Sequence, residues 1–181
     1  MGSAQHRLGW FEAAIDSYQL ALKAAPNFVK VHNNLGLALQ DKGDVDAAIK
    51  AYEKALKIDG NYAEAHNNLG LTLVGKGNFS QVVASNRRAL QIRPDYAEAH
   101  SQLAHAQRYH GSEQHQKQML DLYDRKDLSQ SDRMHLNFAL GKVHDNISDF
   151  DQAVGFFMRE IASENRCSGI TLKQIASCFK V

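Results

Sequence analysis

Apolar residues recur three and four positions apart in two successive stretches of the chain, which is the spacing of one face of an α-helix. Residues 29–42 carry Val31, Leu35, Ala38 and Leu39 in this pattern. Residues 45–58 carry Val45, Ala48, Ile49, Tyr52, Ala55 and Leu56. Between the stretches, Gly43 can take the left-handed conformation that ends a helix, and Asp44 can cap the next helix. The pattern predicts two helices joined by a tight turn.

The same helix pair returns further along the chain. The segment HNNLGL begins at His32 and again at His66, and the segment YAEAH occupies both 62–66 and 96–100. Leu35, Leu69 and Leu103 therefore fall 34 residues apart. Such self-similarity is typical of an array of stacked helix pairs.

Several positions within this period match a known family. Leu35-Gly36 and Leu69-Gly70 match its first helix, Gly43 and Gly77 match its turn, and Ala48, Tyr52, Ala55 and Pro94 match its second helix and closing proline. The pattern resembles the tetratricopeptide-repeat (TPR) family. It departs from that family at His32, His66, Gly60, Val82 and Asn86. The resemblance implies an all-α fold, a right-handed superhelical solenoid of antiparallel helix pairs.

The phase of the repeat predicts how the chain is organised. The expected units are a partial repeat with its second helix at 1–28, repeats at 29–62 and 63–96, a divergent repeat at 97–130, a TPR-like helix pair at 131–162 and an irregular tail at 163–181 with a short helix over 172–179. Leu140-Gly141 follows Leu103 by 37 residues, which indicates an insertion of about three. We expect the chain to begin inside a repeat, so that an uncapped apolar N-terminal face allows self-association.

In TPR proteins the first helix of each unit lines a concave face that binds a partner. The positions that the resemblance assigns to this face are Lys30, Asn33, Asn34, Leu37, Gln40 and Asp41, then Glu64, Asn67, Asn68, Leu71, Val74 and Gly75, and then Glu98, Ser101, Gln102, His105, Arg108 and Tyr109. We interpret these residues as a groove for an extended peptide or partner protein.

Asn34, Asn68 and Gln102 form a column spaced by one repeat. A carboxamide offers both donors and an acceptor, so it can pair with the main chain of a ligand whatever the ligand's side chains. The column resembles the asparagine ladder of O-linked N-acetylglucosamine transferases. The alternative is that these amides are ordinary solvated positions on a helix surface.

Composition and charge narrow the classes of protein and of binding partner that the sequence allows. Apolar residues make up 44% of the chain and charged residues 23%, which is typical of a globular protein. A net charge of +1, and the alternation of Lys30, Glu64 and Glu98, argue against a nucleic-acid partner. No apolar run is long enough to cross a membrane, and no secretory signal is recognisable. With Cys167 and Cys178 as its two cysteines, we expect reduced thiols and a cytoplasmic location.

The nine histidines do not predict a metal site. His32, His66 and His100 occupy one position in successive repeats, too far apart to share a zinc ion with bonds of about 2 Å. His105, His110 and His115 are five residues apart, which separates neighbours by roughly 140° around a helix. No phosphate-binding loop, nucleophile elbow or metalloprotease motif occurs. We therefore expect no cofactor, no metal and no complete catalytic site.

A second resemblance implies an alternative function. Leu128-Ser129, Asp132-Arg133 and residues 136–142, within 119–160, resemble the last repeats of bacterial proteins in which TPRs precede a sulfotransferase domain. Residues 166–172 look like an altered form of the phosphosulfate-binding loop of that family, but no strand precedes them as such a loop requires. The favoured function is a protein-binding scaffold, and the alternative is the repeat region of a sulfotransferase whose catalytic domain is missing or degenerate.

Overall fold

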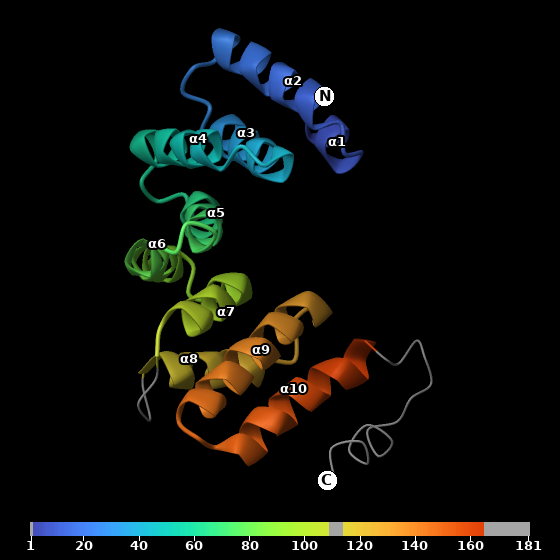
Figure 1. Ribbon diagram of the computed structural model, residues 1–181, viewed down its shortest axis with the longest axis vertical. Helices are drawn as coiled ribbons and strands as arrows, with labels where there is room; N and C mark the ends of the chain where they lie inside the picture. Colours follow the sequence, from blue (N-terminus) through green and yellow to red (C-terminus); the bar gives the residue numbers. More distant parts are fainter. Residues whose placement is uncertain (1, 109–113, 165–181) are drawn as a thin grey trace. The chain divides into compact units, whose positions relative to one another are not determined.

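The computed structural model describes residues 2–108 and 114–164, and all regular elements in these ranges are α-helices (Figure 1). The chain divides into two compact units, Met1–Pro94 and Asp95–Val181. No described helix is both long and apolar enough to cross a membrane. The short helix expected over 172–179 lies outside the described residues.

The first unit consists of three successive helix pairs. They are α1 (Gly2–Arg7) with α2 (Phe11–Ala24), α3 (Val29–Lys42) with α4 (Val45–Ile58), and α5 (Ala63–Val74) with α6 (Phe79–Ile92). The helices of each pair pack on each other, and α2 packs on α3 as α4 packs on α5 (Figure 1). This arrangement confirms the all-α fold of antiparallel helix pairs.

The turns within the pairs form as the sequence predicts. Gly9, Gly43 and Gly77 have φ angles of 75°, 93° and 69°, in the left-handed region that glycine adopts without a steric penalty. Asp44 then accepts a hydrogen bond from the Ala47 amide at 3.2 Å. Asn78 accepts one from the Gln81 amide at 3.4 Å. The helix ends are therefore set by local residues.

Close packing within several of the pairs depends on a glycine in the first helix. A Cβ added at Gly36 would lie 2.5 Å from the ring of Tyr52, sixteen residues later. The same spacing places Gly2 against Tyr18 and Gly141 against Phe157. Gly2 thus holds the position of Gly36, and α1 supplies the end of a first helix where the sequence predicted only the second helix of this unit.

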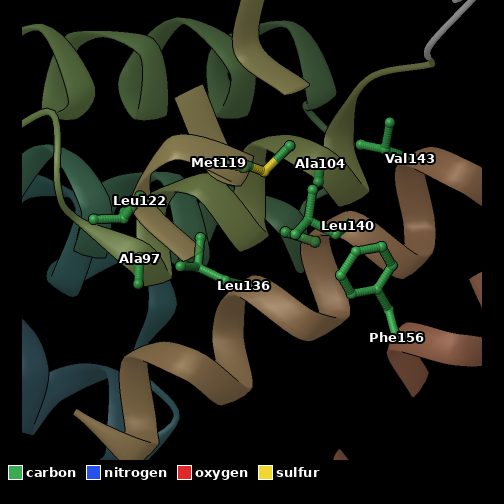
Figure 2. Packing of buried hydrophobic residues seen from close by; sticks show 9 residues of the cluster. Ala97, Ala104, Met119, Leu122, Leu136, Leu140, Val143 and Phe156 are labelled. Carbon is green, nitrogen blue, oxygen red and sulfur yellow. The ribbon is translucent and has the colours of Figure 1, made fainter. Parts of the chain in front are cut away.

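The second unit consists of α7 (Ala97–Ala106), α8 (Gln114–Tyr123), α9 (Gln130–Asn146) and α10 (Phe150–Glu164). Helix α9 packs against α7, α8 and α10 and is the centre of the unit. Figure 2 shows the buried cluster that these helices share, made of Ala97, Ala104, Met119, Leu122, Leu136, Ala139, Leu140, Val143 and Phe156.

Candidate functional site

The predicted ligand face of the first unit lies on α3 and α5, and its residues differ widely in exposure. Lys30 and Asp41 are exposed, while Asn34, Leu37, Gln40, Glu64 and Asn68 are half-buried. Leu71 and Val74 expose 40% and 42% of their surface. Asn33 and Asn67, in contrast, are only 4% and 0% exposed. These last two residues do not offer a free surface to a ligand.

Carboxamides on this face connect one repeat to the next. The Asn68 side-chain amide donates to the Asn33 side-chain oxygen at 3.0 Å, from α5 to α3. The Gln40 side-chain oxygen accepts from the Thr72 hydroxyl at 2.5 Å and from the Tyr52 hydroxyl at 3.1 Å. Burial raises the pKa of Tyr52, so that its hydroxyl keeps the proton that it donates.

Asn34 differs from Asn68 in having no such partner. Among the described residues its side chain makes no hydrogen bond, and it is half-buried one helical turn from Lys30. Asn68 uses one of its two donor hydrogens on Asn33, which leaves its oxygen and its other N–H. The two amides therefore retain donors and acceptors that can bind a ligand main chain.

The carboxylates of the face are paired within the unit. Asp41 accepts from the His6 ring at 2.7 Å, which ties α3 to α1. Glu64 forms an ion pair with Arg93 at 2.8 Å, which ties α5 to the end of α6. The predicted face thus carries little unpaired negative charge.

In the second unit, five of the six predicted face residues lie on or next to α7 in the described part of the chain. Glu98 accepts a hydrogen bond of 3.4 Å from the Gln102 amide, and both residues are half-buried. His105 and Arg108 are exposed. Tyr109 lies outside the described residues.

Sequence reasoning did not assign ligand-face residues to α9. The packing of Gly141 on Phe157 aligns α9 with α3, so His135, Phe138, Lys142 and Asp145 correspond to Lys30, Asn33, Leu37 and Gln40. Phe138 is 41% exposed at this position. The sixteen-residue spacing from glycine to aromatic residue is the signal that finds this register.

The repeated histidines hold the turns between repeats. His32 Nε2 lies 2.7 Å from the carbonyl oxygen of Pro26, and His66 Nε2 lies 3.1 Å from that of Gly60. Because a carbonyl only accepts, the ring nitrogen donates in each case. Burial lowers the pKa of His66, while its bond to Gly60 acts in the opposite direction. These contacts give His32 and His66 a structural role in the turns between repeats.

Nothing in the described parts of the chain gathers metal ligands. No group of three or more histidine, cysteine, aspartate or glutamate side chains is placed to hold an ion there. His100 Nδ1 lies 2.8 Å from His115 Nε2, with the two rings stacked. Residues 166–172, which resembled a phosphosulfate-binding loop, lie outside the described residues.

A surface cleft lies between α4 and α6, over the last turns of α5. Its larger part has a volume of about 520 Å³ and an adjoining part about 210 Å³. Ile49 and Leu73 line both parts, and Asp46, Lys50, Glu53 and Lys76 supply charges of both signs at the larger part. The sequence analysis did not assign a site to the second helices.

Three successive helix pairs with a left-handed glycine in the turn of each, together with a 34-residue period, define a helical-repeat protein. Family models agree with this class. A model described as "TPR repeat" matches residues 2–43 and 38–77, and one described as "Tetratricopeptide repeat" matches residues 63–96. The chain belongs to the tetratricopeptide-repeat family.

Solved structures share the fold. A crystal structure of MamA is 23% identical with a TM-score of 0.67, over 94% of this chain and 98% of that one. The first TPR domain of Spaghetti (RPAP3), bound to the HSP90 peptide SRMEEVD, is 20% identical with a TM-score of 0.57, over 58% of this chain and 83% of that one.

Part of a larger protein also resembles this chain. A mutant of the Thermobaculum terrenum O-GlcNAc transferase is 29% identical with a TM-score of 0.57, over 67% of this chain. The match spans about a quarter of that protein, 24% of its chain. Comparison with curated protein sequences finds no match. Family and fold together make the chain a protein-interaction scaffold of the TPR type.

Proposed function

We propose that the chain binds an extended peptide segment of a partner protein along the first-helix faces, with Asn34 and Asn68 bonding to the main chain of the peptide. The observation that carries the proposal is the pair of half-buried carboxamides one repeat apart, with Asn34 lacking a side-chain partner among the described residues. The exposed side chains of Leu71 and Val74 lie on the same helix as Asn68 and supply apolar contact for the peptide.

The pairing of nearby charges also supports a peptide that is recognised mainly through its main chain. Asp41 and Glu64 are held by His6 and Arg93, so neither carboxylate is free to select a basic side chain. A TPR domain of RPAP3 occurs in complex with a peptide, which supports this type of ligand for the fold. On this proposal Lys30 lies beside the peptide as an exposed rim residue.

The test begins with peptides selected against the full chain from a random library and measured by fluorescence anisotropy. Replacing Asn34 with Ala should weaken binding by about three- to tenfold, because one hydrogen bond contributes roughly 0.5–1.5 kcal/mol. Far-ultraviolet circular dichroism should show unchanged helix content. The double replacement of Asn34 and Asn68 should weaken binding further.

Gln19→Ala is the matched control, because Gln19 is an exposed carboxamide on the second helix α2. It should leave peptide affinity unchanged. Asn68→Ala also removes the hydrogen bond to buried Asn33, so its effect on stability is measured separately by urea unfolding. Equal affinity of the wild-type chain and the double variant for every selected peptide would exclude the proposed ladder.

A further inference from the structure

The outward stripe of α9 places an aromatic ring at its centre. Residues at helical spacing on the side of α9 away from the core are exposed or half-buried, namely Ser131, Met134, His135, Phe138, Lys142 and Asp145. Their neighbours Leu136, Asn137, Ala139 and Leu140 are buried. Phe138 is therefore presented to solvent by a helix that is fixed by the core of the second unit.

The ring of Phe138 is supported from beneath. Its centroid lies 6.4 Å from that of Phe157 on α10, with the ring planes tilted by 56°. Phe157 in turn packs so closely on Gly141 that an added Cβ would lie 2.6 Å from its ring. An exposed aromatic ring held by a second ring loses little conformational freedom when a ligand binds. The half-buried Met134, one turn before Phe138, adds adaptable apolar surface.

The charges around this ring cancel locally. Lys142 forms an ion pair with Asp145 at 2.9 Å, one turn further along α9. Neither charge is therefore free to favour a ligand side chain of opposite sign. An uncharged apolar side chain is the ligand group that a supported ring with a neutral rim fits best.

We propose that Phe138, with Phe157 and Met134, forms an anchor site for an aromatic or long aliphatic side chain of the bound peptide. Because Gly141 on α9 corresponds to Gly36 on α3, Phe138 holds the position that Asn33 holds on α3. The site therefore belongs to the same type of first-helix face. The inference rests on the proposed function, because it names the side chain that a peptide ligand carries.

The test uses the full chain labelled with 4-fluorophenylalanine and observed by fluorine NMR. The probes are capped pentapeptides of sequence Gly-Ser-X-Ser-Gly, with Phe, Leu, Ser or Glu at X. The Phe and Leu peptides should shift the Phe138 resonance in a saturable way, while the Ser and Glu peptides should not. The resonance is assigned from its loss in Phe138→Leu, which keeps an apolar side chain at the site.

Phe150 is the matched control, because it is 61% exposed at the start of α10, away from the stripe of α9. Its resonance should not respond to any of the peptides. Phe138→Ser should abolish binding of the Phe peptide, detected through the remaining resonance of Phe157, with unchanged circular dichroism. Equal shifts at Phe150 and Phe138, or no shift at Phe138, would overturn the anchor site.

Two further outcomes separate the candidate occupants and the two proposals. Concentration-dependent broadening of the Phe138 resonance without peptide would show that a second copy of the chain covers the ring, and would overturn the peptide anchor. A response to the Phe peptide that persists after Asn34 and Asn68 are replaced by Ala supports the anchor site. The same replacements test the ladder separately, because unchanged affinity for the library peptides would exclude the ladder and leave the anchor site standing.

Discussion

Left-handed residues end the first helices of four pairs, and one of them is not glycine. Gly9, Gly43 and Gly77 take this conformation, and Ser148 takes it at the end of α9 with φ of 61°. The register from Gly141 places Ser148 at the same repeat position as Gly43. A side chain with a Cβ is strained in this region of backbone conformation.

Replacing Ser148 with Gly should therefore stabilise the second unit. We expect the free energy of unfolding to rise by about 1 kcal/mol, because glycine removes the clash of the Cβ in the left-handed conformation. Urea unfolding followed by circular dichroism measures the change. Ser129→Gly is the control, since Ser129 caps α9 and its replacement should lower stability instead. A lower midpoint for Ser148→Gly would contradict the assigned strain.

Residues that produce the resemblance to the sulfotransferase proteins have structural roles in the second unit. Ser129 accepts a hydrogen bond from the Asp132 amide at 3.0 Å and donates to its carboxylate at 2.6 Å, which caps α9. Arg133 donates to the carbonyl oxygens of Tyr123 and Arg125 and lies 5.0 Å above the Tyr123 ring. The segment between α8 and α9 is thus held by these residues themselves.

The α5–α6 pair lacks the aromatic contact that the α1–α2, α3–α4 and α9–α10 pairs share. Tyr18, Tyr52 and Phe157 each pack on a glycine of the preceding helix, but Gly70 meets Asn86 instead. Asn86 is fully buried, and its side-chain oxygen has no hydrogen-bond partner. Its side-chain amide donates to the Val82 carbonyl oxygen at 3.1 Å within α6. A polar group in this position weakens the pair, because its desolvation is not compensated.

Asn86→Tyr should accordingly stabilise the first unit. Removing an unpaired buried oxygen and adding a ring against Gly70 should raise the free energy of unfolding by about 1–3 kcal/mol. The fully buried Tyr52 shows that the equivalent position beside Gly36 accepts this side chain. Thermal unfolding checks the change. Gly70→Ala/Asn86→Tyr should lose the gain, since the new methyl group would strike the ring.

The whole molecule has almost balanced charge. Its 21 basic and 20 acidic residues give a net charge of +1. Ion pairs such as Arg93–Glu64 and Lys142–Asp145 neutralise part of that charge on the first-helix faces. Long-range attraction of a highly charged partner is therefore weak, and short-range contacts dominate binding.

Peptide affinity should consequently depend little on salt. We expect library-selected peptides to bind with a dissociation constant that changes by less than about threefold between roughly 50 and 200 mM sodium chloride, whereas proteins that make many phosphate contacts lose about a thousandfold or more. Anisotropy titrations at both salt concentrations test this, with a single-stranded oligonucleotide as the comparison ligand. A loss of tenfold or more would indicate that unpaired charges on the faces carry the binding.

Much of the fold could be predicted from the sequence, because helix ends depend on residues that are close together along the chain. Gly43 ends a helix and Asp44 caps the next because both effects arise within a few residues, and the expected turn is present. The period of 34 residues predicted that consecutive pairs would bury one another. The site was less predictable, because whether a polar residue meets solvent depends on the neighbouring helix.

The sequence alone determined the repeated helix pair and the side of the first helices that carries carboxamides. Both depend on helical periodicity and turn residues, which act locally. Only the tertiary structure decided that Asn33 and Asn67 are buried and that Asn68 donates to Asn33 across two helices. It also decided the register of α9, through the packing of Phe157 on Gly141, and with it the exposure of Phe138. These features depend on which surfaces meet between helices that are far apart along the chain, and the spacing of residues within one helix does not encode them.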